Sequence, residues 1–226
     1  MKMTRREFAL VHCSAVLGLA SVAGAGSGLA GAATTASASG TGKTILVVGD
    51  SLSAEYGLQR GQGWVALLAQ RLQQQKPAWQ AQNASISGDT TSGGRTRLPA
   101  LLAQYKPAIV IIELGANDAL RGLPLASSKD NLAAMASTAK AAGAKVLLIG
   151  MQMPPNYGAA YERDFEAVFT QVAQAGKTAL LPFLLKGVAD RPEGMDAWFQ
   201  ADRIHPLAKA HPILLDNVWA VLKPML

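Results

Sequence analysis

Two kinds of apolar pattern alternate along the chain from about residue 44 onward. Short continuous runs of aliphatic residues are typical of buried strands, and longer segments with apolar residues three or four positions apart are typical of helices. The pattern predicts strands at 44–48, 79–85, 108–114, 145–151 and 178–183. It predicts helices at 64–75, 97–105, 128–142, 161–175 and 207–222, with Ser128 as the cap of the third.

This alternation indicates repeated βαβ units. The predicted fold class is therefore α/β: a three-layer α/β/α sandwich around a five-stranded parallel sheet in the flavodoxin-like order 2-1-3-4-5. Residues 39–226 are expected to form one domain. In such a sheet, side chains that follow the strand ends meet at one edge, where ligands bind.

The first 38 residues follow a different pattern and are predicted to be an export signal with a linker. Lys2, Arg5 and Arg6 precede a stretch from Phe8 to Gly42 that contains no Asp, Glu, Lys or Arg. The paired arginines in TRREF are similar to a twin-arginine signal, which places the mature protein in the periplasm or outside the cell. A membrane anchor is the alternative, but the many glycines make this stretch weakly apolar.

Composition and net charge limit the class of protein and the partners that we expect. Half of the 226 residues are hydrophobic and 16% are charged, as in globular proteins. Loss of the leader's charged residues (Lys2, Arg5, Arg6 and Glu7, net +2) lowers the net charge from +6 to about +4. No basic run with interleaved aromatics exists, so we expect no nucleic-acid partner.

Cleavage of the leader also removes Cys13, the only cysteine of the chain. The mature protein then has no thiol nucleophile and no disulfide. A zinc site would need both His205 and His211, whose spacing is awkward for two ligands on one helix. The dinucleotide fingerprint G-x-G-x-x-G is absent after the first strand. The segment GTGKT is similar to the end of a phosphate loop, but it precedes the first strand instead of following it. We therefore expect no metal and no cofactor.

Five residues after predicted strand ends form a candidate acyl-transfer site. Ser51 is the candidate nucleophile and His205 the base that takes its proton. Asp202, three residues before His205, can hold the imidazole in one tautomer. The backbone N–H groups of Ser51 and Gly88 and the amide of Asn117 can bind a developing oxyanion. Each residue alone has an ordinary explanation as a cap, a turn or a packed side chain, but together they favour the site.

His211 is the competing base. It lies in the last predicted helix with no carboxylate three residues before it, so a structural or exposed position is the favoured interpretation.

Four blocks of this sequence resemble the SGNH, or GDSL, hydrolases: GDSLS at 49–53, Gly88, GAND at 115–118 and DRIHP at 202–206. The similarity is closest to the bacterial thioesterase I, lysophospholipase and arylesterase subfamily. It implies the same triad and oxyanion residues, and it implies hydrolysis of thioesters, simple esters and lysophospholipids. Glu55 departs from the small residue expected there, and at four residues past the nucleophile it is expected to alter the rim of the entrance.

The acyl chain is expected to lie against the loop after the fourth strand and the segment that follows Asn117. The candidate substrate-binding residues are Leu120, Met153, Pro154, Pro155 and Tyr157. Two other functions remain open, a carbohydrate acetylesterase on the same scaffold and a non-catalytic flavodoxin-like binding protein. The mature protein is expected to be a monomer with no membrane span.

Overall fold

A parallel sheet forms the centre of the computed structural model, which describes residues 42–153, 155–191 and 194–226. Its strands are β1 (Lys43–Gly49), β2 (Trp79–Asn83), β3 (Ile109–Glu113), β4 (Lys145–Ile149) and β5 (Ala179–Leu181). Their order is β2-β1-β3-β4-β5, and all neighbours pair in parallel. This confirms the predicted fold class and strand order. The predicted leader lies outside the described residues.

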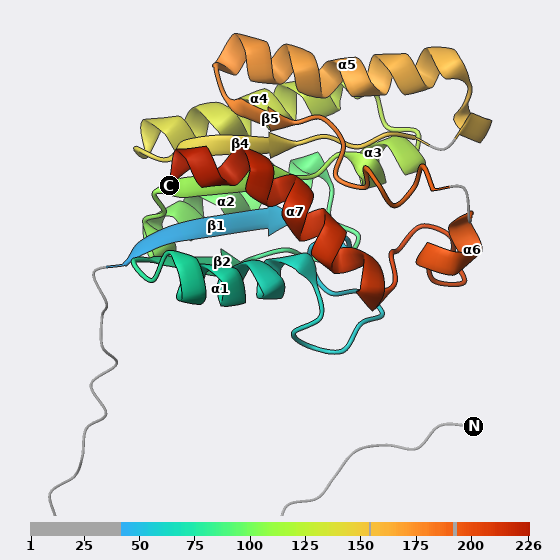
Figure 1. Cartoon of the computed structure of the whole chain (residues 1–226). Coiled ribbons are helices and arrows are strands. Elements are labelled where there is room, and N and C mark those ends of the chain that lie inside the picture. The colour runs from blue at the N-terminus through green and yellow to red at the C-terminus, as the bar shows by residue number, and fades with distance from the viewer. Residues whose placement is uncertain (1–41, 154, 192–193) are drawn as a thin grey trace, which may run out of the picture. The chain divides into compact units, whose positions relative to one another are not determined.

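Helices cover both faces of the sheet (Figure 1). On one face α1 packs against α7, and on the other α4 packs against α2 and α5. Burial from both sides explains why β1, β3 and β4 consist of continuous apolar runs. The helices are α1 (Trp64–Gln75), α2 (Thr91–Tyr105), α3 (Ala116–Leu120), α4 (Leu125–Ala141), α5 (Ala159–Gly176), α6 (Met195–Trp198) and α7 (His211–Leu222). Three short 3-10 turns are η1 (Pro155–Tyr157), η2 (Ala208–Ala210) and η3 (Lys223–Met225).

Helix α2 begins six residues before the predicted start at 97. Thr90 caps it, because its hydroxyl accepts the N–H of Gly93 at 3.3 Å. Gly94 lies inside the helix, and a Cβ there would come within 2.3 Å of the Leu114 side chain. The absence of a side chain at Gly94 therefore permits close packing of α2 against Leu114, although glycine lowers helix propensity.

The prediction that Ser128 caps a helix is wrong. Helix α4 begins at Leu125, and Ser128 lies inside it, where its hydroxyl donates to the buried carboxylate of Asp118 at 3.3 Å. Asp118 also accepts the backbone N–H of Thr91 at 2.9 Å. One buried carboxylate thus joins α2, α3 and α4 and fixes the short helix α3, which carries Asn117.

Among the helices of the described ranges, none combines the length and the apolar character needed to cross a membrane.

Candidate active site

Ser51 lies in a tight turn directly after β1. The Asp50 carboxylate accepts the N–H of Leu52 at 3.0 Å, and the Asp50 carbonyl accepts the N–H of Ala54 at 2.9 Å. Gly49 is required before this turn, since a Cβ there would lie 2.8 Å from the Glu113 carboxylate. The strand end and the turn therefore set the direction of the serine side chain.

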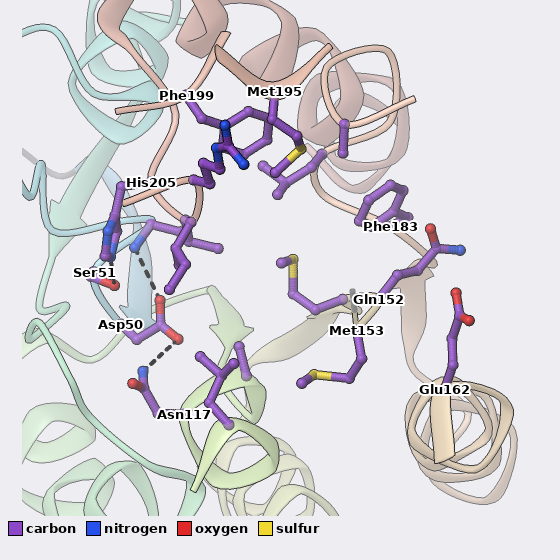
Figure 2. Close-up of a pocket in the computed structure, with 18 of the residues that line it drawn as sticks. Asp50, Ser51, Asn117, Gln152, Met153, Glu162, Phe183, Met195, Phe199 and His205 are labelled. Carbon is purple, nitrogen blue, oxygen red and sulfur yellow. Dashed lines mark hydrogen bonds between the residues drawn. The ribbon is translucent and has the colours of Figure 1, made fainter. Parts of the chain in front are cut away.

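The structure brings together the three predicted triad residues. The Ser51 hydroxyl lies 2.8 Å from Nε2 of His205, and Nδ1 of His205 lies 2.6 Å from Oδ2 of Asp202. His205 and Asp202 come from the segment between β5 and α7, and Figure 2 shows His205 beside Ser51 at one end of the cavity. An acid, an imidazole and a hydroxyl thus form one hydrogen-bonded chain.

Asp202 is held by its own turn. Its Oδ1 accepts the backbone N–H groups of Ile204 at 2.9 Å and His205 at 3.0 Å. Partial burial alone raises the pKa of this carboxyl, but these two N–H groups and the imidazole outweigh it and lower the pKa to about 2. Asp202 is therefore ionised at neutral pH and keeps the proton of His205 on Nδ1, so that Nε2 can accept from Ser51.

Of the three predicted oxyanion donors, Ser51 and Asn117 line the cavity, and Gly88 lies in the loop after β2. Within the described part of the chain, the N–H groups of Ser51 and Gly88 donate to no protein acceptor. Gly88 has a φ of +78°, a conformation that favours glycine. The Asn117 amide donates to Oδ2 of Asp50 at 3.0 Å, and Asn117 lines the same cavity as Ser51 (Figure 2). Both N–H groups therefore lack a protein partner in these ranges, and Gly88 is not among the residues that line the cavity.

Two arginines hold the loop that carries Gly88. Arg97 pairs with Asp89 at 2.8 Å and also donates to the carbonyls of Ala84 and Gly49, which ties the loop to the end of β1. Arg121, just after α3, donates to the Gly88 carbonyl at 2.8 Å. The loop after β2 therefore has a fixed position relative to both the nucleophile turn and α3.

A pair of buried carboxyls lies beneath the nucleophile turn, and the sequence analysis assigned neither a role. Glu113, at the end of β3, accepts from the Ser53 hydroxyl at 2.7 Å and the Asp50 N–H at 3.3 Å. Burial raises the pKa of Asp50 to about 6. Burial, and then the charge of Asp50, raise the pKa of Glu113 well above its usual value. The position of Glu113 at a strand end is the signal that could have found it.

An apolar cavity of about 520 Å³ opens beside Ser51 and His205. It extends from these residues to Gln152 and Glu162 (Figure 2). Leu120 and Met153 line it, as predicted. Met151, in the predicted loop, also lines it, whereas the sequence analysis did not foresee five large apolar lining residues from a later segment: Phe183, Leu185, Met195, Phe199 and Ile204.

The prediction that Tyr157 lines this cavity is wrong. Tyr157 is absent from the described lining, is 39% exposed and stacks on Tyr161 with ring centroids 6.2 Å apart. The 3-10 turn η1 directs the tyrosine toward α5. Pro154 and the side chain of Pro155 lie outside what the structure describes.

His211 has a structural position. It is buried, and its Nδ1 accepts the backbone N–H of Trp64 at 3.0 Å, which joins the first residues of α7 and α1. Burial lowers the pKa of His211, so the ring stays neutral and keeps this acceptor. In the ranges that the structure describes, no group of three or more His, Cys, Asp or Glu side chains could hold a metal ion.

The Glu55 carboxylate is hydrogen-bonded to the backbone that follows it. Its Oε1 accepts the N–H groups of Gly61 at 3.0 Å and Gly63 at 2.8 Å, which closes the segment between the nucleophile turn and α1. Glu55 is not among the residues that line the cavity, and its effect on the entrance rim stays a prediction.

The α/β/α fold, the chain of Asp202, His205 and Ser51, and the adjacent apolar cavity define the architecture of a serine hydrolase. The chain belongs to the GDSL-like Lipase/Acylhydrolase family, which matches residues 47–213. This confirms the resemblance inferred from the four sequence blocks, and the chain is an ester hydrolase.

Named relatives cover most of this chain. Esterase TesA of Pseudomonas aeruginosa is 56% identical over 81% of this chain and 90% of its own length. The arylesterase of Vibrio mimicus is 40% identical over 80% of this chain and 88% of its own length. The thioesterase 1/protease 1/lysophospholipase L1 of Escherichia coli K12 is 39% identical over 80% of this chain and 84% of its own length. A crystal structure of TesA has a TM-score of 0.77 and 56% identity, and the match covers 81% of this chain and 100% of that one.

Proposed function

We propose that this protein hydrolyses carboxylic esters and thioesters through an acyl-enzyme on Ser51. The observation that carries the proposal is the continuous chain of hydrogen bonds, 2.8 Å from Ser51 to His205 and 2.6 Å from His205 to Asp202. Such a chain prepares a hydroxyl to lose its proton as it attacks. The substrates are aryl esters, acyl thioesters and lysophospholipids, as the names of the relatives suggest.

The reaction follows from the geometry. The Ser51 oxygen bonds to the acyl carbon while its proton passes to Nε2 of His205. The negative charge on the former carbonyl oxygen is bound by the N–H groups of Ser51 and Gly88 and by the Asn117 amide. Collapse of this intermediate breaks the bond to the alcohol or thiol, which takes the proton from His205. Water, deprotonated by His205, then releases the acid and restores Ser51.

The cavity supports an acyl chain longer than acetyl. Its apolar lining begins beside Ser51 and provides burial for several methylene groups, each of which stabilises binding by about 0.8 kcal/mol. A rate that rises from acetyl to medium-chain esters is expected. Activity on acetyl esters alone would favour the carbohydrate acetylesterase alternative.

Export to the periplasm or beyond is part of the proposal. It rests on the n-region basic residues, the long uncharged stretch and the small residues of positions 1–38. We further propose that the mature enzyme is a monomer.

Covalent labelling tests the proposal directly. A fluorophosphonate forms a stable bond only with an activated serine, so the purified mature protein should carry the label on the peptide that contains Ser51, as read by mass spectrometry. The variants Ser51→Ala and His205→Ala should remain folded and unlabelled. Folded wild-type protein without label would contradict the mechanism and favour the non-catalytic alternative.

A further inference from the structure

The ring of Tyr56 lies against the imidazole of His205. Their ring centroids are 4.3 Å apart, with an angle of 39° between the planes. Tyr56 is nevertheless 49% exposed, so burial of the ring in a core does not explain its position. Neither the family match nor the named relatives assign it a role.

Three hydrogen bonds of Gln200 connect the Tyr56 backbone to the loop that carries His205. Its carbonyl accepts the side-chain N–H of Gln200 at 2.9 Å, and the same Nε2 donates to the Pro206 carbonyl at 3.3 Å. The backbone N–H of Gln200 donates to the His205 carbonyl at 2.8 Å. One glutamine thus joins the segment after the nucleophile to both residues of the His205–Pro206 pair.

Gly57 makes this join possible. Its φ is +70°, and a Cβ there would lie 2.0 Å from Oε1 of Gln200. Any other residue at 57 would push the glutamine away. The close approach of the two loops is therefore built into the backbone next to Tyr56.

The aromatic ring of Tyr56 can stabilise the orientation of the His205 imidazole. His205 is held at Nδ1 by Asp202 and at Nε2 by Ser51, and both hydrogen bonds lie near the ring plane, so they oppose tilting of the ring out of that plane only weakly. An aromatic ring packed on one face opposes this motion and keeps water from that face. The ring also attracts an imidazolium through its π-electrons more strongly than a neutral imidazole. The imidazolium forms only as Ser51 loses its proton, so this attraction favours the transition state over the ground state.

We propose that Tyr56 is a positioning residue for the catalytic base, and that Gln200 places it there. This inference rests on the proposed mechanism, since it requires His205 to be the base. The proposed role depends on the aromatic ring of Tyr56 and not on its hydroxyl group. Within the described part of the chain the Tyr56 hydroxyl forms no hydrogen bond.

The test compares Tyr56→Leu with Tyr56→Phe in the purified mature enzyme, on p-nitrophenyl butyrate. Leucine should lower kcat by about 5- to 30-fold with KM unchanged within about twofold, and phenylalanine should restore kcat to near the wild-type value. Equal kcat in Tyr56→Leu and wild type would overturn the proposal. Equal impairment by phenylalanine would overturn it as well, because the hydroxyl would then be responsible. A loss confined to KM would show instead that the ring binds substrate.

Gln200→Leu provides the second variant. It removes the donor to the Tyr56 and Pro206 carbonyls, and it should lower kcat in the same direction. The double variant with Tyr56→Leu should fall little further, because both changes remove one contact. Fully additive losses would contradict the role of Gln200 in placing the ring.

Fluorophosphonate labelling separates this inference from the proposed function. Wild-type enzyme that carries no label on Ser51 would overturn the mechanism and the inference together. Labelled wild type with an equal labelling rate in Tyr56→Leu would overturn the inference alone. A slower rate in Tyr56→Leu, restored by phenylalanine, would support it without any contribution from ester binding.

Discussion

In the proposed mechanism the nucleophile turn (residues 49–53) supplies Ser51 and the base loop (residues 200–206) supplies His205, but the structure holds the two segments in different ways. Asp50, Leu52 and Ser53 in the turn are at most 4% exposed, and their partners come from β2 and β3. In the base loop Ile204 is 44% exposed and the Arg203 side chain 65%. The loop's hydrogen bonds run mainly to its own neighbours.

Because of this difference, substitutions in the two segments should change different properties: the free energy of unfolding in the first and kcat in the second. Core packing fixes the nucleophile turn, so changes there should alter the free energy of unfolding. The base is fixed by a few polar contacts and one exposed ring, so changes there should alter kcat while the fold remains. The predictions below test this separation.

Asp202→Asn should have the largest effect. The asparagine oxygen can still accept the N–H groups of Ile204 and His205, so the turn remains. Its NH₂ group would face Nδ1 of His205 and place the imidazole proton on Nε2, where it blocks acceptance from Ser51. We expect kcat to fall by about 10⁴-fold with little change in Tm.

Asp196→Asn is the matched control. Asp196 pairs with Arg203 in the same exposed region, at 2.9 Å, but touches no triad residue. Surface ion pairs of this kind contribute little to stability, so both kcat and Tm should stay near wild type. A large fall in Tm for Asp202→Asn would show that the base loop supports the fold after all.

Glu113→Gln tests the buried side of the comparison. Burial, and then the Asp50 charge, raise the pKa of Glu113 well above 4.5, so the folded chain keeps a proton that the unfolded chain releases. The stabilising protonated form is fully present below the unfolded pKa, and its contribution is lost as pH rises toward the folded pKa, by about 1.4 kcal/mol per pH unit. Glutamine cannot ionise and can still accept from Ser53.

Thermal unfolding of both proteins from pH 4 to pH 8 measures this effect. The Tm of Glu113→Gln should rise relative to wild type as pH increases. Part of the slope should remain in the variant, because burial also raises the pKa of Asp50, to about 6. Asp164→Asn, a change of an exposed carboxyl on α5, should follow the wild-type curve. Parallel curves for wild type and Glu113→Gln would show that Glu113 does not hold an extra proton.

The sheet and the triad could be predicted because both depend on local pattern. Apolar runs separated by amphipathic segments define the strand order, and Ser51 and Asn117 each follow the end of a strand in the chain. Asp202 and His205 are three residues apart, so one turn suffices to bring them together.

The features that the sequence did not predict depend on tertiary packing. The start of α2 depends on the fit of Gly94 against Leu114, which local helix propensity cannot show. Tyr157 has an apolar ring in the expected loop, but η1 directs it toward α5. A large part of the cavity wall comes from the segment between β5 and α7, where the sequence has no regular period.

The smallest expected effect concerns Glu55, which lies in the segment that links the nucleophile turn to Tyr56 and the base loop. Its φ is +61°, which a side chain disfavours by about 1 kcal/mol, but its carboxylate accepts two backbone N–H groups. Glu55→Ala loses both hydrogen bonds and keeps the strained backbone. Glu55→Gly loses the same bonds and relieves the strain.

Both variants should therefore be less stable than wild type, and the glycine variant should exceed the alanine variant by about 1 kcal/mol, or roughly 2–4 °C in Tm. Calorimetric unfolding of the three proteins at one pH measures the difference. A glycine variant more stable than wild type would mean that the two hydrogen bonds stabilise less than the strain costs. Equal Tm values for alanine and glycine would mean that position 55 relaxes when its carboxylate is lost. In that case kcat should fall as well, because Tyr56, the next residue, would lose its position against His205.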